Sequence, residues 1–67
     1  MKDVIISSNW FDTRVIVTDN PRETLVKYYI HYYKNVMNSW IDNDMAQIVT
    51  NDGCIIKMEI LDHLDYY

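Results

Sequence analysis

The sequence predicts an α+β fold of the order ββαββ, with one helix packed on an antiparallel sheet of two hairpins. Three observations lead to this prediction. Two short runs rich in β-branched residues precede residue 20, a strong helix-start signal follows them, and two strand patterns around a tight turn come last. At 67 residues the chain is expected to form a single small domain over residues 1–67.

The first hairpin is predicted from residues 4–7 and 13–18, which contain Val-Ile-Ile and Val-Ile-Val runs. Neither run alternates cleanly, so both faces of these strands are expected to be covered or the strands to lie centrally. The turn between them contains Trp10 and Phe11, which are unusually apolar for a turn. They serve either as a lid on a small core or as an anchor for a partner.

The helix is predicted to start at Pro21 and to run to about Ile41. Asn20 is placed to accept hydrogen bonds from free backbone amides, Pro21 suits the first helical position, and Glu23 completes a capping box.

The predicted helix has an apolar arc of about 220°, from the 3.6-residue period. One sheet covers about half a helix, so the rest needs another cover. The run 27–34 is nearly palindromic, which suits an isologous contact, and a core this small favours association. We therefore predict a homodimer, with these residues forming the helical core and dimer face: Tyr29, Tyr33, Val36, Met37 and Trp40.

The second hairpin is predicted from strands over 45–50 and 54–61 with a turn at 51–53, where Gly53 takes positive φ. Alternation in the last strand places Cys54, Ile56, Met58 and Ile60 on one face. Residues 62–67 either extend this strand or form one helical turn.

Catalytic and metal-site patterns are absent from the sequence. His31, Cys54 and His63 are scattered, no nucleophile stands at a recognisable spacing from a histidine, and the single glycine excludes a glycine-rich phosphate loop. Cys54 is expected to be a small buried hydrophobe. We predict a protein that is not an enzyme and has no cofactor and no metal.

Localisation is predicted to be cytoplasmic. No signal peptide precedes the domain, no apolar stretch approaches the ~20 residues that span a membrane, and the single cysteine fits a reducing compartment.

Charge is distributed unevenly along the chain. Residues 1–41 contain five basic and four acidic side chains, and residues 42–67 contain one basic and six acidic, so the two segments carry +1 and −5. This field opposes direct nucleic-acid binding, although Lys27 and Lys34 flank a tyrosine-rich run. The acids serve either solubility or the imitation of DNA phosphates. Under the second interpretation the partner-binding residues are Asp42, Asp44, Asp52, Glu59, Asp62 and Asp65.

The chain resembles the small acidic early proteins with which bacteriophages of Gram-positive hosts disable host machinery. The resemblance rests on the shortness of the chain, the scarcity of Gly and Pro, the Asn-, Asp-, Tyr- and Met-rich stretches 32–38 and 41–45, and the tail 65–67. Several such proteins mimic DNA and bind the histone-like nucleoid protein HU, the sliding clamp, uracil-DNA glycosylase or RNA polymerase. The resemblance implies inhibition of a basic DNA-binding host protein in the host bacterial cytoplasm, with an HU-type protein as the first expectation.

The alternative is an interaction adaptor or inhibitor that binds a host protein through apolar and aromatic surface. Trp10, Phe11 and the outer tyrosines of the helix would form that surface.

Overall fold

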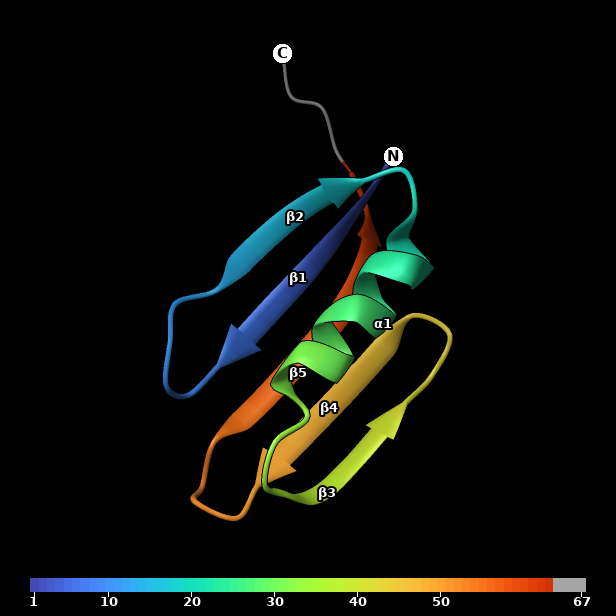
Figure 1. Ribbon diagram of the computed structural model, residues 1–67. Helices are drawn as coiled ribbons and strands as arrows, with labels where there is room; N and C mark the ends of the chain where they lie inside the picture. The colour runs from blue at the N-terminus through green and yellow to red at the C-terminus, as the bar shows by residue number, and fades with distance from the viewer. Residues whose placement is uncertain (64–67) are drawn as a thin grey trace.

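The computed structural model describes residues 1–63 as five strands and one helix in the order ββαβββ (Figure 1). The predicted α+β architecture with a helix on an antiparallel sheet is confirmed, with one strand more than predicted. The elements are β1 (Lys2–Ser8), β2 (Arg14–Thr18), α1 (Pro21–Tyr32), β3 (Val36–Ile41), β4 (Met45–Thr50) and β5 (Ile55–Asp62).

Strand β5 lies at the centre of the sheet, whose order is β2-β1-β5-β4-β3 with every neighbouring pair antiparallel. It pairs with β1 through Val4 and Ile60, and with β4 through Ala46 and Met58. β5 therefore joins the N-terminal hairpin to the strands that follow the helix, and α1 lies across one face of the sheet (Figure 1).

The core is a single layer between α1 and this face of the sheet. Leu25 is the only fully buried residue of the helix. Alternation in the central strands supplies the rest, and the buried apolar residues there are Val4, Ile6, Ala46, Ile48, Ile56 and Met58. Cys54, which directly precedes β5, is also buried, which confirms the expectation of a small buried hydrophobe.

The start of α1 is only partly as predicted. Pro21 begins the helix and Asn20 occupies the N-cap position, as predicted. The Asn20 side chain makes no capping hydrogen bond, so the prediction that it accepts from the free backbone amides is wrong. Instead, the Thr18 hydroxyl accepts hydrogen bonds from the Asn20 backbone N–H (3.0 Å) and from the Thr24 hydroxyl (3.2 Å). The side chain that organises this end of the helix comes from the last residue of β2.

The helix ends at Tyr32, so the prediction that it continues to about Ile41 is wrong. Asn35 has φ 52°, a left-handed conformation that Asn tolerates better than most residues. The Asn51 side-chain amide donates hydrogen bonds to the backbone carbonyl of Asn35 (3.1 Å) and to its side-chain oxygen (3.0 Å). This tertiary contact holds a turn that redirects the chain into β3, the strand missing from the prediction.

The predicted helical dimer face is therefore divided between several elements. Tyr29 is in α1, where its hydroxyl donates to the Ser39 hydroxyl (2.9 Å), and Tyr33 follows the helix. Val36 packs against the core at the start of β3, and Met37 lies where the β3–β4 register shifts. Trp40 is on the opposite face of the sheet from α1, as its pairing with Gln47 shows. These residues do not form one helical surface.

The turn residues Trp10 and Phe11 have different environments. Phe11 packs against the core and stacks on Tyr32, with 5.6 Å between ring centroids, so it acts as the lid. Trp10 is exposed.

The first hairpin was expected to be covered on both faces or to lie centrally in the sheet. Only β1 has an internal position in the sheet. Strand β2 is an edge strand, and its Val15 and Val17 are exposed.

The second hairpin is confirmed. β4 and β5 have nearly the predicted bounds, and Gly53 in the turn has φ 94°. Asp62 belongs to β5, so the strand extends one residue beyond its predicted end. The rest of the tail prediction, including Asp65, falls on residues 64–67, outside the described residues.

Replacing Leu25 with Ala is expected to lower the free energy of unfolding by about 2–5 kcal/mol, because the change leaves a cavity between helix and sheet. Ile30→Ala in the same helix is the control, since Ile30 is 67% exposed and should change it by less than about 0.5 kcal/mol. Denaturant unfolding followed by circular dichroism measures both. Equal losses would show that Leu25 does not anchor the helix.

Candidate protein interface

Six acidic side chains lie at one end of the sheet, where β1 begins, β2 and β5 end, and β3 turns into β4. We call this the acidic end, and its members are Asp3, Asp19, Glu23, Asp42, Asp44 and Asp62. Several contacts hold these segments together. Lys2 pairs in register with Thr18 and Asp62, the Ile60 backbone N–H donates to the Asp44 carbonyl (2.8 Å), and the Arg22 guanidinium donates to the Asp42 carbonyl.

Among residues 1–63, only two basic side chains, Lys2 and Arg22, accompany these acids, so the acidic end carries a net side-chain charge of −4 with histidine neutral. The remaining charged side chains of the described residues are Arg14, Lys27, Lys34 and Lys57 against Asp12, Asp52 and Glu59, a net of +1. The net charge of the described molecule therefore changes along the strand direction, from −4 at the acidic end to +1 over the rest.

The structure brings together three of the six acids predicted to bind a partner: Asp42, Asp44 and Asp62. Glu59 is three residues before Asp62 on β5 and level with Met45, so it borders the acidic end on the open face. Asp52 is in the β4–β5 turn at the opposite end, so the prediction of one patch containing both Asp52 and Asp42 is wrong. Asp65 is outside the described residues.

Sequence reasoning missed the other three members of the acidic end, Asp3, Asp19 and Glu23. All three come from the segment with net charge +1, so counting charge along the chain could not find them. The antiparallel pairing of β1 with β5 and with β2 reveals Asp3 and Asp19. The start of α1, where Arg22 reaches the Asp42 carbonyl, places Glu23 at the same end.

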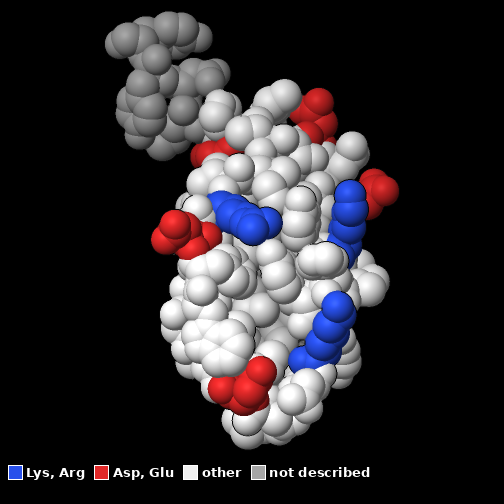
Figure 2. Space-filling view, turned by 60° about the vertical axis from the view of Figure 1, so that its left-hand side comes forward, with Lys and Arg blue, Asp and Glu red and all other residues white. Residues whose placement is uncertain are grey.

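Two of the six carboxylates are engaged within the molecule. Lys2 pairs with Asp62, and His63 Nδ1 lies 2.9 Å from a carboxylate oxygen of Asp3. The other four, Asp19, Glu23, Asp42 and Asp44, are exposed and form no ion pair within residues 1–63. Figure 2 shows the acidic side chains of that view as separate groups with uncharged surface between them, some beside a basic side chain, so a continuous row of carboxylates does not cross this face.

A second candidate interface is the face of the sheet that α1 does not cover, which we call the open face. It is formed by the residues that alternate with the core. Its apolar members are Ile5, Val15, Val17, Trp40, Met45, Val49, Ile55 and Leu61, and its polar members are Asp3, Ser7, Asn38, Gln47, Lys57 and Glu59. Eleven large apolar side chains are exposed among the described residues, and six of them are here. An apolar surface gathered on one face indicates an interaction site.

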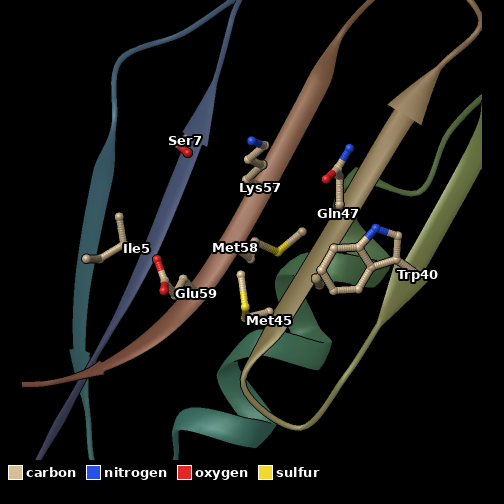
Figure 3. A pocket seen from close by; sticks show the side chains of 9 residues that line it. Ile5, Ser7, Trp40, Met45, Gln47, Lys57, Met58 and Glu59 are labelled. Carbon is tan, nitrogen blue, oxygen red and sulfur yellow. The ribbon is translucent and has the colours of Figure 1, made fainter.

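A pocket of about 160 Å³ lies on the open face, between β1, β5, β4 and β3 (Figure 3). Ile5, Trp40 and Met45 supply apolar walls, and Lys57 and Glu59 supply its charged groups. Neither the histidines nor the cysteine line it. This composition suits a side chain of a binding partner.

The residues that most often carry chemistry are not brought together. Cys54 is buried with its sulfur 3.5 Å from the Ser8 hydroxyl, and His31 lies on the exposed side of α1 against Tyr28 and Tyr32. Within residues 1–63 no three His, Cys, Asp or Glu side chains are grouped to hold a metal ion. None of the helical structure described is long and apolar enough to cross a membrane.

Comparison with protein-family models, with curated proteins and with solved structures gave no match. Function is therefore inferred from the two surfaces.

The Lys2–Asp62 pair has a testable consequence. The hydrogen bond and charge of Lys2 lower the pKa of Asp62 below its usual value of 3.8. Because the folded-state pKa is depressed, this pair stabilises the fold above the ordinary carboxyl range and loses that effect as pH falls through the folded pKa. NMR titration of the Asp62 carboxyl carbon should show a higher pKa in Lys2→Met than in the unchanged protein. The same pKa in both proteins would contradict the pair.

Proposed function

We propose that this protein acts by binding, without chemistry of its own, and that its acidic end occupies the DNA-binding surface of a basic host protein. The observation that supports this most is the separation of charge, −4 at one end against +1 over the rest of the described side chains. Surface charge that serves only solubility is usually mixed in sign, whereas a field of one sign gathered at one end steers an oppositely charged partner.

The four exposed carboxylates that form no ion pair within residues 1–63 provide the direct contacts. Asp42 and Asp44 flank the tight β3–β4 turn, where the backbone N–H of Asp42 donates to the Met45 carbonyl (2.7 Å). Asp19 and Glu23 flank the start of α1 beside it, where Arg22 reaches the Asp42 carbonyl. Carboxylates held on short turns are preorganised, so little side-chain and loop ordering opposes their contact with Lys and Arg.

The partner class follows from the chemistry of DNA-binding surfaces, which offer clustered Lys and Arg to phosphates. An HU-type nucleoid protein is our first candidate. Its complex with this protein should weaken steeply with salt, since exposed ion pairs are screened.

Replacing Asp42 and Asp44 together with Asn should reduce displacement of labelled duplex DNA from HU by about tenfold or more, equivalent to about 1.4 kcal/mol. The matched control is the Asp12→Asn and Asp52→Asn pair, which removes the same charge from the opposite end and should change displacement little. Fluorescence anisotropy of the DNA over a salt series measures both.

Equal effects of the two pairs would mean that only total charge matters and would overturn the acidic end as a site. An unchanged protein that displaces no DNA from HU at low salt would exclude HU as the target.

The open face favours a second function, that of an adaptor or inhibitor that binds a host protein through apolar contacts. Its six exposed apolar side chains include Trp40, and Trp is typical of interface cores. Partner binding that survives high salt, resists the Asp42 and Asp44 changes, and is lost in Trp40→Ala would support this function over DNA mimicry.

A further inference from the structure

The open face is an unpartnered surface whose charge pattern indicates what covers it. Lys57 and Glu59 are both on this face of the central strand β5, two residues apart. Both are exposed, and both line the same pocket (Figure 3). On the neighbouring strands, Ile5 and Met45 are level with Glu59, and the polar Ser7 and Gln47 are level with Lys57. The exposed apolar side chains of Trp40, Ile55 and Leu61 lie further out on the same face. A partner must therefore offer apolar surface with one acidic and one basic group in its middle.

A second copy of the chain meets this requirement. Consider two open faces in contact, related by a two-fold axis that crosses the strands between Lys57 and Glu59. This operation places Lys57 of each copy opposite Glu59 of the other, so the dimer contains two such pairs and each of the four charges has one partner. A two-fold axis along the strands would place Lys57 against Lys57 and Glu59 against Glu59, which is repulsive.

The remaining features of the face agree with the same axis. Trp40 is level with Lys57, because both pair with Gln47, and Met45 is level with Glu59. The operation therefore brings Trp40 of one copy beside Met45 of the second copy, an aromatic–sulfur contact of a favourable kind.

Long-range repulsion between the two acidic ends also favours the antiparallel orientation. The two copies run antiparallel, so their acidic ends lie at opposite poles of the pair. A parallel arrangement would bring two ends of charge −4 together.

We propose that the protein is a homodimer in which two open faces pack together antiparallel, giving four layers in the order helix, sheet, sheet, helix. This replaces the helical dimer face predicted from sequence. A stable interface needs about 800 Å² from each copy, roughly one sixth of the chain's accessible surface of 4783 Å². One whole face of a two-layer molecule can supply this share. Sheets packed in this way lie about 10 Å apart, with side chains interdigitated.

The test is a charge exchange followed by sedimentation equilibrium. Lys57→Glu and Glu59→Lys, each alone, place like charges opposite each other and should raise the dimer dissociation constant by about tenfold or more. An equimolar mixture of the two variants should associate again. In the mixed pair the K57E copy presents two carboxylates, and the E59K copy presents two ammonium groups at the facing positions. Effects within one copy are unchanged by mixing, so recovery reports contact between copies.

Matched controls change the same charges elsewhere. Lys27→Glu lies on the exposed side of α1 and Asp12→Lys in the β1–β2 loop, and both should leave dimerisation unchanged. Ile30→Glu tests association through the helix and should also have no effect. Circular dichroism verifies that each variant is folded.

Two results would overturn the proposal. One is an unchanged protein that remains an 8.1 kDa species at about 1 mM, a concentration that detects very weak association; the open face would then be left to a different protein. The other is a mixture of the two variants that associates no better than either alone. Neither result bears on the acidic end, so failure of the dimer and failure of the proposed function are distinguishable.

Discussion

The constraint on which this structure depends is that one short helix covers a five-stranded sheet. Five strands span about 19 Å at a spacing of about 4.8 Å, whereas a helix with its side chains is about 10–12 Å wide. The 12-residue α1 therefore covers the central strands of one face, with Leu25 as its single fully buried residue. Nothing in residues 1–63 covers the other face. The small core, the exposed valines of β2 and the pocket beside Trp40 all follow from this.

The sequence predicted those parts of the fold that depend on local chemistry. The β4–β5 hairpin is marked by Gly53 and by alternation in β5, and the helix start by Pro21, because each signal acts within a few residues. The end of the helix was not predictable in this way. Tyr33, Val36, Met37 and Trp40 recur at helical spacing, and the contact that ends the helix comes from Asn51, sixteen residues away from Asn35. A tertiary hydrogen bond competes here with local periodicity.

The acidic end shows the same limit in the candidate site. Asp42 and Asp44 were predictable because they are close in sequence, and the grouping of acids after residue 41 pointed to them. Asp3 and Asp19 join them only because β1 pairs with both β2 and β5. Asp52 is absent from the acidic end for a related reason. It follows β4 whereas Asp44 precedes it, so the length of this strand separates the two side chains. The distribution of charge along a chain predicts the distribution of charge on its surface only where residues close in sequence also lie at the same end of the fold.

The two surfaces are linked through β5. This strand carries Lys57 and Glu59 on the open face and Asp62 at the acidic end. In the proposed dimer, pairing of the open faces would therefore fix how the acidic ends are presented. In an antiparallel pair the acidic ends point in opposite directions, and each carries its own four exposed carboxylates that form no ion pair within residues 1–63. A partner with two basic arms would then bind both poles, and the second contact would be intramolecular, which raises affinity without any new contact within either pole. Under this proposal the open face would affect recognition through geometry, even though its own contacts are largely apolar.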